Sequence, residues 1–304
     1  MKRRSFLAGS SAILLAACGK SSPKIRLALN WKPDPQFGGF YAAPYAQHSL
    51  DVDILPGGAG TPTIQMVGAG SAEFGIVSAD ELVVARSQGN DVVALFAVFQ
   101  NNPQGIMVHA SRKLKDLGDV FKSGTVALQK GLPYARLLEQ KYGFAKVKIV
   151  PSPGGDISAF LSDPNFAQQC FIVSEPLTAR HKGADVQVFP VSGVGYNPYT
   201  TVLATSGESL NKDPARAAAM VEAVRQGWQA YLNDPGPTNQ KMNQLNPSME
   251  ASVFAEVAEA QKPLIEAPML GAMTKDRWAT LITQLKDLGD IRTAPTPEEC
   301  FQAL

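Results

Sequence analysis

Between residues 24 and 191 the sequence repeats one pattern, in which a short apolar stretch is followed by a segment with helical periodicity. Stretches such as 73–77 and 92–98 are almost wholly apolar, as expected of strands that are covered on both faces. Strands that alternate with helices favour a largely parallel sheet with helices on both sides. The pattern therefore predicts an α/β fold.

The order of the expected elements indicates two lobes rather than one. We expect strands at 24–31, 51–55, 73–77, 92–98, 106–109, 125–128, 147–150, 170–173, 186–191 and 200–204. We expect helices at 39–47, 62–69, 80–88, 114–121, 133–142, 157–161, 176–181, 214–232, 249–262, 275–288 and 297–303. Only helices follow residue 204, which is explained if the chain leaves a first lobe near Gln104, returns near Thr200 and completes that lobe with its last helices.

Two such crossings would form a two-stranded hinge between the lobes. We predict a first lobe of residues 24–103 plus 201–304 and a second lobe of residues 104–200. Ligands of open α/β sheets bind beyond the carboxyl ends of the strands. Two lobes that face each other would therefore enclose a cleft at those ends.

The N-terminus predicts export and lipid attachment. Lys2, Arg3 and Arg4 precede an apolar run from Phe6 to Ala17 that is shorter than the roughly 20 residues needed to span a bilayer. Cys18 follows Leu-Ala-Ala, as in a bacterial lipoprotein signal. We predict a signal peptide at 1–17, with features of a twin-arginine signal, a tether at 18–23, and a mature protein anchored to the membrane at the periplasm or outer cell face through lipidated Cys18.

Composition excludes several classes of function. The net charge is +1 with 18% charged residues, and no basic run lies outside the signal, so no nucleic-acid partner is expected. Cys170 and Cys300 are expected to be free, buried thiols. His48, His109 and His181 lie far apart, and no metal-ligand spacing, phosphate loop or nucleophile elbow is present, so we expect neither a metal nor a cofactor, and no enzyme.

Residues 30–43 form the most informative segment. Asn30 and Trp31 leave the first strand, two prolines follow, and the chain enters a helix at Gly38-Gly39. Glycines at a helix start allow a ligand to approach the backbone closely. Trp31, Phe37 and Tyr41 could stack on an aromatic ligand, although packing in the core of a lobe is the alternative for each of them.

Four motifs give the chain a resemblance that covers nearly all of the predicted mature sequence. They are Trp31-x-Pro33 with Gly39-Phe40-Tyr41-Ala42-Ala43, Val77-Ser78-Ala79-Asp80-Glu81, Pro103-Gln104-Gly105-Ile106 and Ser174-Glu175-Pro176. In this order they resemble the NMT1/THI5-like family of periplasmic binding proteins. The resemblance implies a type II periplasmic-binding-protein fold that serves an ABC importer of thiamine-pathway pyrimidines, of riboflavin or, in more distant relatives, of sulfonates or nitrate.

The same resemblance includes eukaryotic pyrimidine synthases, which carry a histidine in the segment after the tryptophan. Phe37 occupies that position here, and the cysteine-rich run of those enzymes is missing. This residue content argues against the synthase interpretation.

Residues at the ends of strands supply candidate contacts with the ligand. Asp80 and Glu175, one from each lobe, could accept N–H donors of an aminopyrimidine, although Asp80 could instead cap a helix and Glu175 could be a turn residue. An anion receptor would need basic groups there, and Lys32 and Lys130 are the nearby candidates. We predict ligand contacts from these residues: Asn30, Trp31, Phe37, Gly39, Tyr41, Ser78, Asp80, Gln104, Gln129, Tyr134, Glu175, Tyr196 and Tyr199. The expected partners of this monomeric receptor are a small molecule and the permease of an ABC transporter.

Overall fold

The computed structural model describes residues 24–304, and its strands form two separate five-stranded sheets. The predicted signal peptide, the tether and Cys18 lie outside these residues. The first sheet has the order β2-β1-β3-β10-β4 and contains β1 (Ile25–Ala28), β2 (Val52–Leu55), β3 (Phe74–Val77), β4 (Val92–Phe99) and β10 (Thr200–Ser206). The second has the order β7-β6-β8-β5-β9 and contains β5 (Gln104–His109), β6 (Thr125–Leu128), β7 (Lys148–Pro151), β8 (Phe166–Phe171) and β9 (Val186–Pro190).

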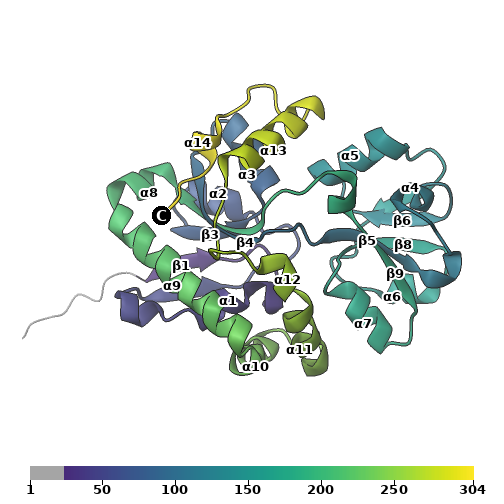
Figure 1. Cartoon of the computed structure of the whole chain (residues 1–304), viewed down its shortest axis with the longest axis horizontal. Helices are drawn as coiled ribbons and strands as arrows, with labels where there is room; N and C mark the ends of the chain where they lie inside the picture. The colour runs from purple at the N-terminus through teal and green to yellow at the C-terminus, as the bar shows by residue number, and fades with distance from the viewer. Residues whose placement is uncertain (1–23) are drawn as a thin grey trace, which may run out of the picture.

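Each sheet lies in its own lobe with its own helices, and the chain passes between the lobes twice (Figure 1). The first lobe holds α1 (Gly38–Ala42), α2 (Thr63–Gly68), α3 (Ala79–Ser87) and the C-terminal helices α8 (Gly207–Lys212), α9 (Pro214–Asn233), α10 (Gly236–Leu245), α11 (Ala251–Ala260), α12 (Lys262–Ile265), α13 (Lys275–Asp287) and α14 (Pro297–Cys300). The second lobe holds α4 (Leu117–Val120), α5 (Pro133–Tyr142), α6 (Ser158–Ser162) and α7 (Glu175–His181). Short 3₁₀ turns lie at Pro35–Phe37, Tyr45–His48, Ala110–Arg112 and Val191–Val194.

The sheets are mixed: in each of them four strands run in the same direction, as the expectation of a largely parallel sheet implies, and one strand runs against the others. β10 pairs antiparallel with β3 and β4, and β5 pairs antiparallel with β8 and β9. These are the two strands that follow the crossings between the lobes. Because they run against their neighbours, they present their first residues, Gln104 and Thr200, at the edge where the parallel strands end.

Other differences from the sequence prediction have local causes. The strand expected at 170–173 spans Phe166–Phe171, because polar Gln168 interrupts the apolar run yet is buried, with its side-chain amide donating to the Asp156 carbonyl at 3.0 Å. The helix expected at 39–47 ends at Ala42, just before Pro44, and the one expected at 249–262 splits at Gln261. Helices α8 and α10 were not expected, and α10 is a largely polar segment.

The long helix α9 forms as its sequence predicts. Asp213 caps it by accepting the N–H of Arg216 at 3.0 Å, and Pro214 occupies the first position. Its buried face includes Val224 and Trp228, which pack in the core of the first lobe.

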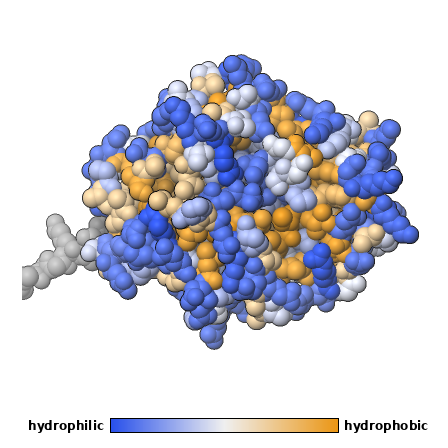
Figure 2. All heavy atoms as spheres, viewed as in Figure 1, coloured by the Kyte–Doolittle hydropathy of each residue, from blue (hydrophilic) through white to orange (hydrophobic). Residues whose placement is uncertain are grey.

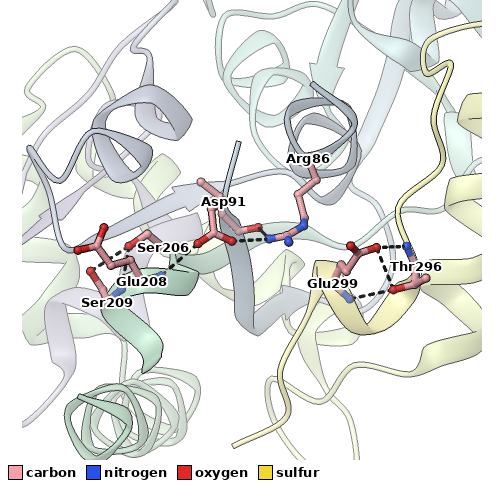
Figure 3. A network of polar contacts seen from close by, with 8 residues as sticks. Arg86, Asp91, Ser206, Glu208, Ser209, Thr296 and Glu299 are labelled. Carbon is pink, nitrogen blue, oxygen red and sulfur yellow. Dashed lines mark hydrogen bonds and ion pairs between the residues drawn. The ribbon is translucent and has the colours of Figure 1, made fainter. Parts of the chain in front are cut away.

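The C-terminal part of the chain is tied to the first lobe by polar contacts (Figure 3). Asp91 accepts from the Arg86 guanidinium at 3.3 Å and from the Glu208 N–H at 3.1 Å, which links α3 to α8. Thr296 and Glu299 form a capping box at the start of α14.

On the face of the molecule that Figure 2 shows, hydrophobic residues form small groups between hydrophilic ones, including some near the middle, where the lobes meet.

Candidate functional site

A cavity of about 770 Å³ lies between the lobes, at the edge where strands of both sheets end. This volume is within the range of small-molecule sites. Its first-lobe lining includes Asn30, Trp31, Asp34, Gln36, Thr63, Ser78, Asp80, Glu81, Thr201 and Asp290. Its second-lobe lining includes Gln104, Gln129, Lys130, Tyr134, Arg136, Gly154, Gly155, Gln169, Phe171 and Glu175.

Trp31 meets the second lobe at the cavity wall. Gly154 and Gly155 adopt left-handed backbone conformations, with φ of 64° and 89°, which favour glycine. A β-carbon on Gly155 would lie 3.4 Å from the Trp31 indole and 3.8 Å from the nearer Glu175 carboxylate oxygen. The glycine pair therefore places backbone of the second lobe close to the Trp31 ring, a proximity that the sequence did not suggest.

Glu175 begins helix α7 and lines the cavity from the second lobe. One of its oxygens accepts the Phe171 N–H at 2.8 Å, which holds the carboxylate beside the end of β8. Removal from water raises the pKa of Glu175 to about 6. A ligand N–H group that replaced this lost hydration would bind the ionised carboxylate strongly.

Ser78, Asp80 and Glu81 follow β3 and begin α3 on the opposite wall. Glu81 accepts both the hydroxyl of Ser78 at 2.6 Å and its N–H at 3.3 Å. Burial, followed by the charge of Asp80, raises the pKa of Glu81. Asp80 accepts the Tyr196 hydroxyl at 2.8 Å, so Tyr196 supports the wall from behind without lining the cavity.

Asp34 and Gln36 are cavity residues that the sequence analysis missed. Both oxygens of Asp34 are engaged by Gln36, through its N–H at 3.0 Å and its side-chain amide at 3.1 Å. Burial is the main cause that raises the pKa of Asp34 to about 7. An aspartate just before a proline is typical of a loop, and nothing in the sequence indicates whether its side chain faces the cavity or the solvent.

Tyr134 and Gln129 share one partner in the second lobe. The Tyr134 hydroxyl donates to the Gln169 side-chain oxygen at 2.7 Å, and the Gln129 N–H donates to the same oxygen at 2.5 Å. Gln169 was not predicted, because it lies within β8, about 40 residues from its partners.

Five of the predicted ligand contacts do not line the cavity: Phe37, Gly39, Tyr41, Tyr196 and Tyr199. Phe37 is fully buried in the first-lobe core. A β-carbon on Gly39 would lie 2.2 Å from the Trp228 ring, so this glycine permits α1 to pack on α9. The Tyr41 ring lies under the Lys241 ammonium, with 5.5 Å between the nitrogen and the ring centroid.

Tyr199 belongs to the crossing segments. Arg277 of α13 stacks on its ring at 3.8 Å and donates to the carbonyls of Gln100 and Asn197, at 2.7 and 2.8 Å. The Arg277 guanidinium therefore contacts both segments that connect the lobes. Thr201, next to these segments, has φ of 54°, which is strained for a β-branched residue and marks this part of β10 as unusual backbone.

The lobes touch on both sides of the cavity. Arg136 of α5 pairs with Asp290 at 2.6 Å, and His181 of α7 contacts Glu256 of α11 at 2.8 Å. Val173 packs with Val253 and Val257 beside the second contact. The cleft is therefore in a closed arrangement.

No group of three or more potential metal-binding side chains occurs among residues 24–304, and Cys170 and Cys300 are free and buried. None of the helices in this part of the chain has the length and apolar character required to cross a bilayer.

The two mixed α/β sheets, the two crossings and the cavity between the lobes define a periplasmic-binding-protein fold. A family model described as NMT1/THI5 like matches residues 34–237, and the chain belongs to this family. The family membership that the four sequence motifs predicted is therefore confirmed.

Individual relatives are distant but cover nearly the whole chain. A formylaminopyrimidine-binding protein from Halalkalibacterium halodurans is 20% identical over 92% of this chain and 90% of its own. The aliphatic sulphonate binding protein SsuA from Escherichia coli superimposes with a TM-score of 0.70, at 14% identity and 92% coverage of both chains. A Candida albicans protein described as having the generic periplasmic binding protein fold gives 0.65, at 16% identity over 92% of this chain and 96% of that one.

Proposed function

We propose that this chain is the solute-binding protein of an ABC importer and that it captures a small nitrogen heterocycle of the thiamine-pyrimidine or riboflavin class. The observation that carries this proposal is that the Trp31 ring and the Glu175 carboxylate both line the cavity and both lie close to Gly155. An aromatic surface and an acceptor at its edge suit a flat ring that bears N–H donors. The formylaminopyrimidine-binding relative supports the same class of ligand.

A receptor for sulfonate or nitrate is the alternative, and the cavity supports it less well. Lys32, one of the two cationic candidates from the sequence, does not line the cavity, and Lys130 is exposed at its rim. The likeness to sulphonate-binding structures is one of fold. A synthase that uses a residue at position 37 is also poorly supported, since Phe37 lies in the core.

The closed lobes together would form the surface that the permease recognises. A ligand stabilises closure only through contacts that it makes in the closed state. Trp31 from the first lobe and Glu175 from the second supply such contacts, because the cleft brings them together. We also propose that the mature protein acts as a monomer, exported and anchored through Cys18; replacing Cys18 with alanine should move it from the membrane fraction to the soluble fraction.

Calorimetric titration tests the ligand class. The mature protein is titrated with hydroxymethyl- and formylamino-substituted aminopyrimidines, riboflavin, an alkanesulfonate and nitrate. We expect a heterocycle to bind, and we expect Trp31→Ala to weaken its binding by about tenfold or more through lost stacking and burial.

Tyr41→Phe is the matched control, since Tyr41 is an aromatic residue of the same segment that lies off the cavity. It should leave the affinity unchanged. Binding of the alkanesulfonate or nitrate, with no heterocycle bound, would contradict the proposal.

A further inference from the structure

The cavity is acidic although the protein as a whole is almost neutral. Its lining carries five carboxylates and two cationic groups. The carboxylates are Asp34, Asp80, Glu81, Glu175 and Asp290, and the cations are Lys130 and Arg136. A cleft lined by one sign of charge concentrates the field and attracts a ligand of the opposite sign.

Most of this negative charge is not balanced by the protein. Asp290 is paired with Arg136, but the ion pairs of residues 24–304 include none of the other four carboxylates. Glu175 and Glu81 accept hydrogen bonds from neutral groups only, namely the Phe171 N–H and the N–H and hydroxyl of Ser78. Buried acids without a cationic partner hold their protons to higher pH, and a positive group in the cavity would favour their ionised form.

Two of these carboxylates come from opposite lobes and repel each other. The charge of Glu175 contributes to the raised pKa of Asp34, which burial brings to about 7, and burial raises the pKa of Glu175 to about 6. Closing the lobes without a ligand therefore places two desolvated acids from different lobes in the lining of one cavity. A positive group between them would remove this cost of closure.

Residues of the wall also contain unpaired polar atoms. The Thr63 hydroxyl, in a residue 3% exposed, and one Asp290 oxygen, in a side chain 5% exposed, are buried and have no hydrogen-bond partner. The side-chain oxygen of Asn30 is buried and unpaired as well. All three residues belong to the lining of the cavity, and each of these atoms can accept a hydrogen bond, although the atoms themselves expose almost no surface.

We propose that the receptor selects its ligand by positive charge, binding an organic ammonium or protonated nitrogen base whose charged group lies between Asp34 and Glu175. This inference rests on the proposed function in taking the cleft as the ligand site, and it adds the charge of the ligand. Asp34 and Glu175, which take part in no ion pair among residues 24–304, would then gain a cationic partner from the ligand. Neutral or anionic compounds of the same shape would close the lobes less well.

The test uses two aminopyrimidines that share one ring, one with an aminomethyl arm, which is an ammonium at pH 7, and one with a hydroxymethyl arm, which is neutral. Calorimetry on the mature protein should give an affinity about tenfold or more higher for the ammonium compound, since charge-assisted hydrogen bonds are the stronger ones. The binding heat should also differ between buffers of different ionisation enthalpy near pH 6.5, because a cation drives protons off the two acids.

The titratable neighbours of Asp34 and Glu175 show which groups could release those protons. Asp34 is faced by Glu175, Tyr41 and Tyr231, and Glu175 by Asp34, Tyr134 and Cys170. The phenols and the thiol have pKa values raised by burial and stay neutral near pH 6.5. Protons released there would therefore come from the carboxyl groups.

Substitutions separate charge from shape. Glu175→Gln and Asp34→Asn should each reduce the preference for the ammonium compound to within about threefold, because the isosteric amides keep the volume and lose the charge. Glu139→Gln, which removes an exposed carboxylate on α5, is the matched control and should keep the full preference.

The outcomes distinguish this inference from the proposed function. Equal binding of the two rings, or tighter binding of the neutral one, overturns charge selection and leaves the heterocycle receptor intact. If neither ring binds but a non-aromatic cation such as a linear diamine does, charge selection stands and the heterocycle is wrong. If no cation binds, or an alkanesulfonate binds instead, charge selection is overturned.

Discussion

Two pairs of adjacent glycines, one in each lobe, require glycine for different physical reasons. Gly38 and Gly39 lie in helix α1, where Gly38 has ordinary helical angles, and any β-carbon would enter the Tyr231 and Trp228 rings at 2.2 Å. Gly154 and Gly155 have room for a β-carbon but adopt left-handed φ values at the cavity wall.

The two pairs should therefore affect different properties: the stability of the folded protein and the closure of the two lobes. The first pair allows close packing inside one lobe, so a larger residue there should disturb the folded core. The second pair brings one lobe onto Trp31 of the other, so a larger residue there should disturb the closed state. Two predictions test this separation, and a third tests the charge of a cavity residue next to the first pair.

The largest effect is expected at the first pair. Gly39→Ala should lower the free energy of unfolding by about 3 kcal/mol, because its methyl group cannot be placed without moving Trp228. Chemical denaturation measures this loss, and the affinity of the remaining folded protein for its ligand should be unchanged. Gly58→Ala, at a position with open space around the β-carbon, is the control. Equal stability of the two variants would break the comparison.

The second pair should show the converse. Gly155→Val should weaken ligand binding by about 2 kcal/mol, since a branched side chain would press on Trp31 of the other lobe when the lobes close. The matched control is Gly183→Val, in the same lobe, with φ of 84° and open space around its β-carbon. Both glycines have similar positive φ values, so an equal loss of affinity in both variants would show that contact with the cleft is irrelevant.

The smallest effect concerns the carboxyl group of Asp34, a cavity residue that lies just before the first glycine pair in the sequence. Asp34 has a pKa of about 7 in the folded chain, raised from 3.8, so between these values the folded protein holds a proton that the unfolded chain has lost. Stability of the ligand-free protein should therefore fall as pH rises, by about 1.4 kcal/mol between pH 6 and 8. Denaturation at both pH values measures it. Asp34→Asn should flatten the change, and an unaltered slope in that variant would assign the titration to another group.

Much of the fold could be predicted, because apolar strands and amphipathic helices carry a local pattern. Helix α9 and strands such as β3 and β4 lie close to their expected positions. The antiparallel direction of β5 and β10 could not be predicted, since direction depends on where the chain crosses between lobes. Strand β8 was displaced because Gln168 is buried by a hydrogen bond that only the tertiary structure supplies.

The lining of the cavity was predictable where it follows strand ends. Eight predicted contacts line the cavity: Asn30, Trp31, Ser78, Asp80, Gln104, Gln129, Tyr134 and Glu175. Aromatic character alone did not distinguish cavity residues, because Trp31 and Tyr134 line the cavity whereas Phe37 lies in the core and Tyr199 in the crossing segments. Asp34 and Asp290 were missed, since nothing local in the sequence shows which way a loop carboxylate faces.

The position of Trp31 has a practical consequence. Of the three tryptophans in the sequence, Trp228 and Trp278 are fully buried, whereas Trp31 is partly exposed and touches the opposite lobe. Opening the lobes would wet this one indole and leave the other two unchanged. The unlabelled protein should therefore report its own opening and closing as a change in tryptophan emission, which would give the rate of ligand capture by stopped-flow fluorescence without any added dye.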